Sequence, residues 1–418
     1  MLEKELVPQL RFSEFDGEWN SSRLGNLGEF KGGGTPTTDN SEYWNGNIPW
    51  ISSSDVKEND ILNLNVTRYL SKKAIEESAT KIIPEGSILF VSRVGVGKLT
   101  VSEVKLCTSQ DFANLSPKKD SSYYIAYYFL SKNKLLHQYA QGTSIKGFTM
   151  GDLKSIPINI PSLPEQQKIA AFLTEVDAKL SQLTKKKVLL ENYKKGVMQQ
   201  IFSQEIRFKH NNSTKFGTRE VSEFPDWEVK KLGDVGTTLN GLTGKTKEDF
   251  GAGKPYIQYK QVFNSSKINI EKCGLVDITD SDKQTKVKYG DVFFTTSSET
   301  PKEIGTASVL LDNIEEMYLN SFCFGFRVEQ TLLYPPFSQY LFRNNDFRKK
   351  MIPLAQGSTR YNISKSAFLK LKVKLPKVEE QNKIANFLSD LDAKIEVLST
   401  SIENTETFKK GLLQQMFV

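Results

Sequence analysis

The chain has 418 residues, of which 38% are hydrophobic and 25% are charged, and this is ordinary for a globular protein of two or three domains. Its formal net charge of +7 is compatible with a polyanionic partner but is weak support for one by itself. The N-terminal sequence MLEKELVPQLRF lacks the apolar core of a signal peptide, and no apolar run approaches the roughly 20 residues that span a bilayer. We therefore expect a cytoplasmic protein without membrane contact. The three cysteines form no CxxC pair, which argues against a disulfide scaffold or structural zinc.

In chain order, short β-like runs alternate with turn clusters and helices. In the first half a glycine-rich turn at 32–40 precedes a strand at 86–94 and an amphipathic helix at 123–140. The second half repeats this pattern, with strands at 290–297 and 324–330 and an amphipathic helix at 337–351. Each half then ends in a long helix that begins after a proline-containing segment. These features predict α+β bodies with mostly antiparallel strands.

The strongest signal is an internal repeat. Residues 165–202 and 380–417 agree without a gap at 18 of 38 positions. Upstream, AQGTS at 140–144 matches AQGST at 355–359, and EWNSSRLGNLG matches DWEVKKLGDVG near the start of each half. The chain is therefore predicted to be one unit of roughly 210 residues, duplicated. We expect the following domains: a first body at 1–163, a central helix at 164–206, a second body at 207–378 and a C-terminal helix at 379–418.

Apolar residues recur in both long helices at alternating steps of three and four, which is typical of a coiled-coil seam. Two unrelated surface helices, each packed on its own body, are the simpler alternative, but identical polar positions in matched register favour mutual, antiparallel pairing. The predicted seam residues are Ile169, Leu173, Val176, Leu180, Leu183, Ile384, Leu388, Leu391, Ile395 and Leu398.

Several motifs suggest enzymes but fail on spacing. In PDWEVK, Asp226 and Glu228 lie two residues apart on one segment, whereas a metal-dependent nuclease needs carboxylates from adjacent strands. GLTGKT at 241–246 lacks the first glycine of a phosphate loop, and YPPF at 334–337 lacks the polar first residue of amino-methyltransferases. The two histidines, His137 and His210, have no evident metal-ligand companions. We therefore predict no catalytic or metal site.

Polar, cationic and glycine-rich loops occupy matching places in the two halves, at 31–38, 51–55, 92–98 and 142–149, and at 240–247, 257–261, 296–302 and 357–364. Arg, Lys, Gln, Ser and Thr suit hydrogen bonds to base edges, and backbone N–H groups in glycine-rich turns suit phosphates. Solvated loop surface is the alternative for any single residue. The predicted DNA-binding residues are Lys31, Thr35, Thr37, Ser53, Arg93, Lys98, Thr143, Ser144, Lys146, Lys245, Gln258, Tyr259, Lys260, Ser297, Lys302, Ser358, Thr359, Arg360 and Lys365.

The helical phrases P-x-x-E-Q-x-K-I-A-x-F-L-x-x-x-D-A-K and K-K-G-x-x-Q-Q-x-F, each following A-Q-G-[ST]-[ST], resemble the specificity subunits of type I restriction-modification systems. The resemblance covers essentially the whole chain. It implies two similar target-recognition domains in a pseudo-two-fold arrangement, each reading one half of an asymmetric, split site in double-stranded DNA. Two antiparallel helices would set the spacing and dock two methyltransferase (modification) subunits, to which restriction (motor and nuclease) subunits attach.

By the same resemblance the chain is non-catalytic, and AdoMet, ATP and Mg²⁺ belong to the partner subunits. Two other classes of protein were considered, of which only the first remains open. A coiled-coil adaptor whose heads bind protein is compatible with the modest net charge. A fused recognition and methyltransferase enzyme is disfavoured because no cofactor-binding loop is present.

Overall fold

The structure is a computed structural model that describes residues 6–140, 147–213, 219–279, 281–358 and 360–418. The chain divides into two units, each with its own core. Unit 1 comprises residues 1–186 and 398–418, and unit 2 comprises residues 187–397. Each unit therefore contains one body together with parts of both long helices.

Unit 1 contains two four-stranded sheets, one of order β2-β9-β6-β7 and one of order β4-β3-β8-β5, with β1 and β10 paired separately. All pairs in this unit are antiparallel except β3 with β8. The strands are β1 (Asn20–Arg23), β2 (Gly28–Gly32), β3 (Ile48–Ile51), β4 (Arg68–Leu70), β5 (Ile82–Ile83), β6 (Ile88–Val91), β7 (Leu99–Val101), β8 (Leu106–Thr108), β9 (Phe112–Pro117) and β10 (Pro157–Ile160). The helices of the body are α1 (Lys72–Glu77), α2 (Ser122–Ser131), α3 (Asn133–Tyr139) and α4 (Met150–Ser155).

Unit 2 repeats this plan, with sheets of order β14-β21-β17-β19 and β16-β15-β20 and a separate pair β13-β23. Its parallel pair, β15 with β20, corresponds to β3 with β8. The strands are β11 (Lys209–Ser213), β12 (Arg219–Glu223), β13 (Glu228–Lys231), β14 (Gly236–Asn240), β15 (Phe250–Ile257), β16 (Gly274–Val276), β17 (Val292–Thr295), β18 (Ser297–Ser298), β19 (Ala307–Val309), β20 (Tyr318–Leu319), β21 (Cys323–Val328), β22 (Tyr361–Asn362) and β23 (Lys372–Leu375). The helices of the body are α6 (Tyr259–Asn264), α7 (Pro335–Leu341), α8 (Asn345–Met351) and α9 (Lys365–Leu369). The predicted α+β class with mostly antiparallel strands is confirmed.

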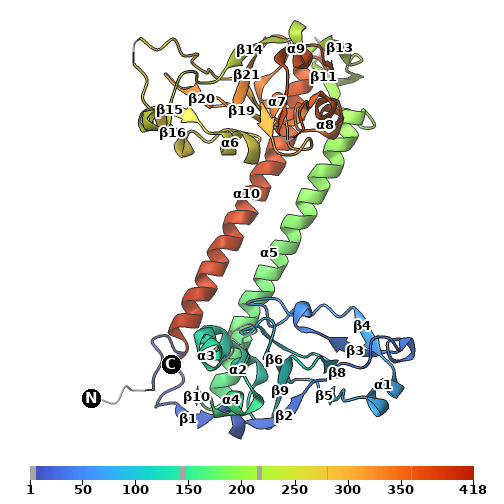
Figure 1. The fold of residues 1–418 in the computed structure, drawn as a ribbon, viewed down its shortest axis with the longest axis vertical. Helices are drawn as coiled ribbons and strands as arrows, with labels where there is room; N and C mark the ends of the chain where they lie inside the picture. The colour runs from blue at the N-terminus through green and yellow to red at the C-terminus, as the bar shows by residue number, and fades with distance from the viewer. Residues whose placement is uncertain (1–5, 141–146, 214–218, 280, 359) are drawn as a thin grey trace. The chain divides into compact units, whose positions relative to one another are not determined.

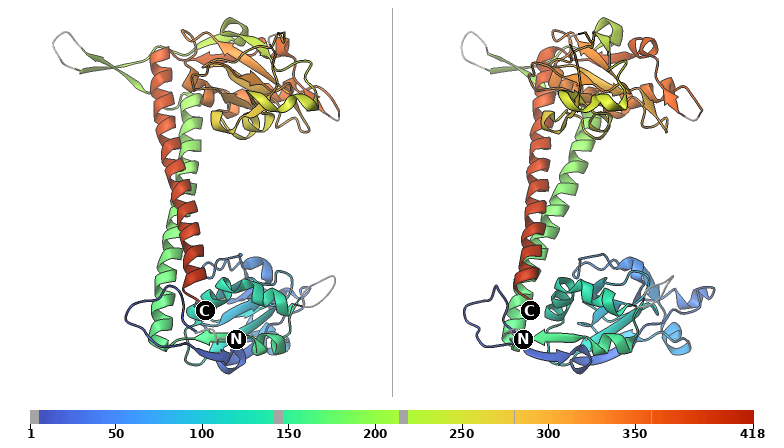
Figure 2. Two further views of the ribbon diagram at one scale, coloured as in Figure 1. Left: turned by 90° about the vertical axis from the view of Figure 1, so that its left-hand side faces the viewer. Right: turned by 60° about the vertical axis from the view of Figure 1, so that its left-hand side comes forward.

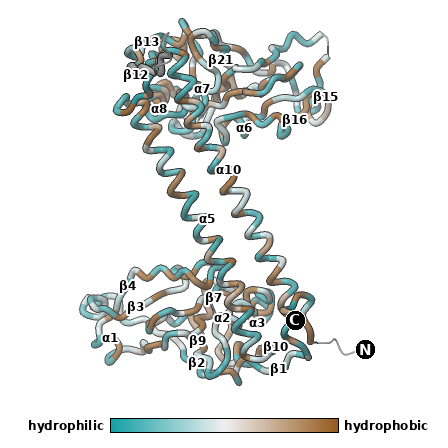
Figure 3. Tube along the Cα trace, turned by 180° about the vertical axis from the view of Figure 1, so that it is seen from behind, coloured by the Kyte–Doolittle hydropathy of each residue, from teal (hydrophilic) through white to brown (hydrophobic). Residues whose placement is uncertain are grey.

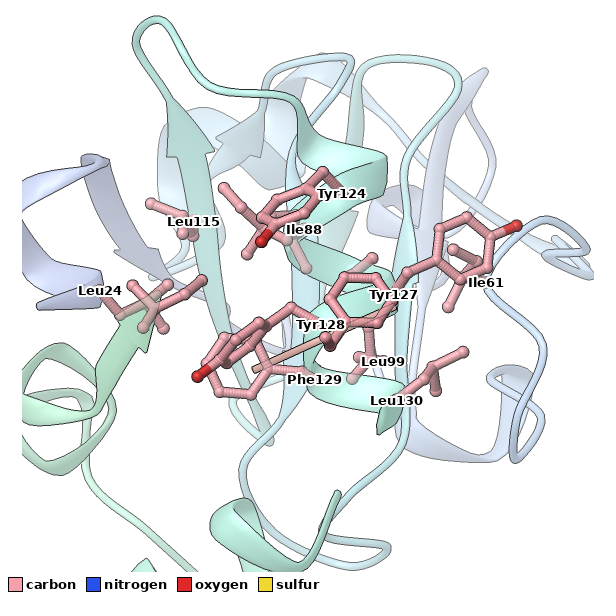
Figure 4. Packing of buried hydrophobic residues seen from close by; sticks show 14 of the residues in the cluster. Leu24, Ile61, Ile88, Leu99, Leu115, Tyr124, Tyr127, Tyr128, Phe129 and Leu130 are labelled. Atoms are coloured by element: carbon pink, nitrogen blue, oxygen red, sulfur yellow. The ribbon is translucent and has the colours of Figure 1, made fainter. Parts of the chain in front are cut away.

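Helix α2 lies in the core of unit 1, where Figure 4 shows Tyr124 and Phe129 of the helix among aliphatic residues of the sheet, including Ile88 and Leu115. All seven residues from Tyr124 to Leu130 are buried. Phe129 packs edge-to-face on Phe90 of β6, with ring centroids 5.2 Å apart. The prediction of one amphipathic helix at 123–140 was wrong in two respects: α3 is separate, and the seven central residues of α2 are all buried in a cluster that also contains residues of the sheet and of both long helices.

The two long helices are α5 (Leu163–Ser203) and α10 (Val378–Gln415), both labelled in Figure 1. Hydrophobic residues recur along both at intervals between hydrophilic ones (Figure 3). In unit 1 the C-terminal end of α10, red in Figure 2, lies beside the first body. Leu412, Met416 and Phe417 join the core cluster that also contains Ile169 of α5. In unit 2, Ile201 and Phe202 join the cluster that contains Ile384 of α10.

The predicted seam residues divide into two groups. Six lie in body cores: Ile169, Leu173 and Val176 in unit 1, and Ile384, Leu388 and Leu391 in unit 2. Leu398 is also buried, whereas Leu180, Leu183 and Ile395 are half-buried. Near its N-terminal end, each long helix thus packs its apolar stripe on the body that precedes it in the chain. The C-terminal end of the other helix joins the same core.

Among the described residues, no helix combines the length and the apolar character needed to span a membrane.

Candidate functional site

The repeated Glu-Gln dipeptide anchors each long helix to its body. Glu165 accepts hydrogen bonds from Arg11 Nε at 2.8 Å and from Trp19 Nε1 at 3.3 Å. Glu380 accepts the equivalent bonds in unit 2, from Arg207 Nη2 at 2.8 Å and Trp227 Nε1 at 3.2 Å. The bond to the buried carboxylate raises the pKa of each arginine. Glu165 and Glu380, which match in the repeat, therefore make equivalent buried contacts.

The neighbouring glutamines close a loop of the body onto the start of each helix. Gln166 accepts from the Ser121 N–H at 3.0 Å and donates to the Pro161 carbonyl at 3.0 Å. Gln381 accepts from the Tyr334 N–H at 2.8 Å and donates to the Pro376 carbonyl at 2.9 Å. Because both side chains are buried, these bonds satisfy groups that would otherwise be costly to bury.

A second repeated contact joins the helices to each other. Asp177 accepts a hydrogen bond from Tyr127 Oη at 2.8 Å, and Lys409 Nζ of α10 lies 2.6 Å from its other oxygen. In unit 2, Asp392 accepts from Tyr340 Oη at 2.8 Å and pairs with Lys194 of α5. Burial is the main cause that raises the pKa of Tyr127, and the negative charge of Asp177 is the second. Burial is also the main cause that raises the pKa of Tyr340. The helices thus make an antiparallel contact in each unit.

Sequence reasoning missed a further matched pair. Phe12 packs edge-to-face on Phe172 with centroids 5.8 Å apart, and Phe208 packs on Phe387 at 5.7 Å. Arg-Phe precedes Trp19 and Trp227, at 11–12 and 207–208, but the second copy is 196 rather than 215 positions later. The change of offset hid this match.

In unit 1 the polar loops converge on one turn, Ser109–Asp111. The Ser109 N–H donates to Ile51 O at 2.8 Å, and Arg93 Nη2 donates to Gln110 O at 3.2 Å. Thr35 donates to the Gln110 side chain, and the backbone of Arg93 bridges to Gly147. A Cβ on Gly33 would collide with the Ser109 carbonyl oxygen, so glycine is needed for this close approach. Segments from all four predicted loop regions therefore meet here.

In unit 2 the loops converge on the matching turn, Asn320–Phe322. The Asn320 N–H donates to Ile257 O at 3.0 Å, and the Thr296 N–H donates to Phe322 O at 2.9 Å. Arg360 lies over the Phe322 ring, 6.0 Å from its centroid. A Cβ on Gly241 would collide with the Asn320 carbonyl oxygen, as on Gly33 in unit 1. Neither turn was predicted, although aligning the two halves places TSQDFA opposite LNSFCF.

The predicted DNA-binding residues differ in how accessible they are. Ser53 is buried, Lys245 pairs with Asp282 at 2.7 Å, and Lys365 donates to Asn240 while burial lowers its pKa. Lys98, Tyr259 and Ser297 are half-buried, with Tyr259 Oη bonded to Ser297 O at 2.9 Å. Thr143, Ser144, Lys146 and Thr359 lie outside the described residues. The exposed members are Lys31, Thr35, Thr37, Arg93, Gln258, Lys260, Lys302, Ser358 and Arg360.

The residues of the rejected enzyme motifs have structural partners. Glu228 pairs with Lys377 at 2.8 Å and with Lys230 at 2.9 Å, and these bonds lower its pKa to about 2. Tyr334 immediately precedes α7, which begins at Pro335. Within the described ranges, no group of three or more His, Cys, Asp or Glu side chains could hold a metal ion.

Comparison with known proteins identifies this arrangement. Residues 16–192 and 225–406 each match the family described as the type I restriction modification DNA specificity domain. The chain is 32% identical to the MjaIX specificity subunit of Methanocaldococcus jannaschii over 59% of its own length and 58% of that relative. It is 26% identical to the MjaVIII specificity subunit of the same organism over 95% of its length and 91% of that relative.

Solved structures show the same fold. The type I restriction-modification S subunit from M. genitalium superposes with a TM-score of 0.62 at 14% identity, covering 99% of both chains. A chain solved in a study of complex assembly and conformational transition of the type I R-M system gives a TM-score of 0.52 at 16% identity, covering 96% of this chain and 97% of that one.

Two matched copies of one DNA specificity domain, carried on paired long helices, define a two-domain DNA-recognition protein. The chain belongs to the family of type I restriction-modification specificity subunits, and its two repeats are target-recognition domains.

Proposed function

We propose that each unit reads one half of a split, asymmetric target in double-stranded DNA. The observation that supports this most directly is the convergence of the polar loops on one turn in each unit, on equivalent backbone frameworks with different side chains. A shared backbone framework that carries different side chains suits two domains that read different short DNA sequences. Exposed cations at these loops, including Arg93, Lys260 and Arg360, would supply contacts to phosphates and base edges.

The two long helices are proposed to set the distance between the half-sites. Two heads reading the same groove face should lie roughly one DNA turn apart, about 10 base pairs centre to centre. Half-sites of about 3 to 5 base pairs then leave roughly 5 to 8 unread pairs between them. A pseudo-two-fold arrangement of the heads would suit both the duplex and two identical partner subunits.

The helices also offer a docking surface for two methyltransferase subunits, to which restriction subunits would attach. In unit 2, Val188, Leu189 and Tyr193 of α5 are 48%, 60% and 54% exposed. Leu189 and Tyr193 are four residues apart and therefore lie on one helical face. Exposed apolar side chains gathered on one face are typical of a protein interface.

Catalysis would then belong to the partners. AdoMet, ATP and Mg²⁺ are proposed to bind the modification and restriction subunits, and this chain is proposed to be non-catalytic by itself and to act in the cytoplasm. AdoMet-dependent methyl incorporation by the isolated chain, freed of partner subunits, would contradict this.

Salt titration of binding to random duplex separates this proposal from a protein-binding adaptor. Neutralised phosphates release counterions, so the logarithm of the binding constant should fall linearly with the logarithm of salt concentration. Binding that is absent or indifferent to salt would favour the adaptor.

Domain exchange tests the split target. Replacing residues 1–160 by those of a related specificity subunit should change one half-site in the methylome of cells that carry the complex and leave the other intact. Methylation in which both halves change, or in which the target is continuous, would overturn the proposal. Arg93→Ala and Lys260→Ala should each affect a different half.

A further inference from the structure

The turn Asn320–Phe322 of unit 2 exposes an aromatic ring at the point where the loops converge. Phe322 is 54% exposed, whereas Phe293, Phe294, Phe324 and Phe326 in the adjoining strands β17 and β21 are fully buried. Phe322 is therefore available for contact at the tip of the turn on which the loops converge.

Besides the bond from the Asn320 N–H to Ile257 O, three hydrogen bonds hold the backbone of this turn. The Phe322 N–H donates to Asn320 Oδ1 at 2.8 Å, the Cys323 N–H donates to Asn320 O at 3.1 Å, and Phe322 O accepts from the Thr296 N–H at 2.9 Å. The ring therefore projects from a fixed base. A side chain with only two rotatable bonds on such a base loses little entropy on binding.

Unit 1 builds the same turn with the same three bonds. The Asp111 N–H donates to Ser109 Oγ at 3.3 Å, the Phe112 N–H donates to Ser109 O at 3.3 Å, and Asp111 O accepts from the Ser92 N–H at 2.7 Å. Asp111 thus occupies the place of Phe322. The framework is shared, but the side chain at this place is a half-buried carboxylate in unit 1 and an exposed aromatic ring in unit 2.

The surroundings of Phe322 point to nucleic acid rather than to an apolar protein surface. Arg360 lies over its ring. Two further exposed cations lie on the segments whose backbones bond to this turn: Lys260 in α6, just after Ile257, and Lys302, in the turn that follows Thr296. An apolar side chain among cations suits the major groove, where thymine alone among the four bases presents a C5-methyl group beside anionic phosphates.

We propose that Phe322 is a specificity-determining residue of unit 2 that recognises one thymine of its half-site through the C5-methyl group. This inference rests on the proposed function, because it requires unit 2 to read DNA. It assigns a base preference to a turn that lies outside the loops first expected to contact the target.

Replacing thymine by uracil tests the inference, because uracil lacks only the methyl group. The complex of this chain with its modification subunits is titrated with duplexes in which each thymine of the unit 2 half-site is replaced in turn. For the unaltered complex, one replacement should weaken binding roughly fourfold, the value for one buried methyl group. In the Phe322→Ala complex that discrimination should vanish, while discrimination at the other positions stays unchanged.

Two further variants serve as controls. Phe322→Leu should keep part of the discrimination, because it retains apolar surface. Val229→Ala removes another exposed apolar side chain of unit 2, on β13, which pairs with β23 and not with the strands that flank the turn, and should leave the whole pattern as it was.

Two results would overturn the inference while leaving the proposed function intact. In the first, the complex binds its target specifically but binds thymine-containing and uracil-containing duplexes equally well at every position. In the second, the ratio of these two affinities at each position is the same for the unaltered complex and for the Phe322→Ala complex. If the unaltered complex binds all duplexes alike, the proposed function itself fails.

Discussion

Lys409 Nζ of α10 lies 2.6 Å from Asp177 Oδ1 of α5, and both side chains are about nine-tenths buried. The residues 215 positions away form the reciprocal pair, Lys194 of α5 with Asp392 of α10. Each helix thus supplies the aspartate in one unit and the lysine in the other. This reciprocity explains why the aspartate and the lysine occur in both copies of the repeat: each helix must supply the aspartate of one pair and the lysine of the other.

Breaking the buried pair should destabilise unit 1 more than breaking its counterpart destabilises unit 2. Lys409→Met keeps the aliphatic stem but leaves Asp177 buried without its cation, at a cost of about 3 kcal/mol. Lys194→Met should cost about 1 kcal/mol or less, because the side chains of that pair are 21% and 36% exposed. Urea unfolding of the two variants measures the difference.

Lys410→Met provides the matched control, since Lys410 is an exposed neighbour on the same helix. Equal losses for Lys409→Met and Lys410→Met would show that the pair makes no special contribution.

The carboxylate of Glu380 should be needed to hold α10 on the second body. Glu380→Ala leaves Arg207 and the Trp227 N–H without their buried acceptor, and should destabilise unit 2 by about 3 kcal/mol. Glu379→Ala changes the adjacent, exposed carboxylate and should have little effect. Hydrogen exchange of the β13–β23 amides reports the loss; equal protection in both variants would contradict the anchoring role.

Acid should weaken the contact between Lys245 and Asp282. The hydrogen bond from Lys245 lowers the pKa of Asp282 from 3.8 to about 2. A carboxyl whose pKa is lowered by folding adds stability above its unfolded pKa, and this is lost as the pH falls through the folded pKa. The stability difference between the unaltered chain and Asp282→Asn should therefore be constant above about pH 5 and shrink from about pH 4 towards 2.

Thermal unfolding of both proteins across this range measures the difference. If the NMR chemical shift of the Asp282 carboxyl carbon titrates with the ordinary pKa of an aspartate, the assignment is refuted.

The exposed apolar face of α5 should be required for complex formation but not for folding. Leu189→Ser together with Tyr193→Ser removes two side chains that are more than half exposed, so the isolated chain should keep its unfolding midpoint. Assembly with modification subunits should weaken at least tenfold in a co-purification titration, because buried apolar anchors dominate such interfaces. Glu191→Ser, at an exposed site between them, is the control; unaltered assembly in the double variant would place the docking surface elsewhere.

The sequence alone predicted the duplication, the α+β class and the existence of the long helices, because repeated letters and hydrophobic periodicity are local properties that survive without coordinates. The sequence did not predict which part of the protein the apolar face of each long helix contacts. Leu173 and Leu388 fit a two-helix seam by spacing, yet each lies in the core of its own body, since periodicity defines a buried face but not its partner.

The candidate site shows the same division. Loop composition selected Arg93 and Arg360, which are exposed, but it also selected Ser53, which is buried, and Lys245, which is held by Asp282. It missed Gln110 and Phe322, because an ordinary turn carries no composition signal of its own. Only the tertiary structure brought distant loops to these turns, since convergence depends on strand pairing between segments tens of residues apart.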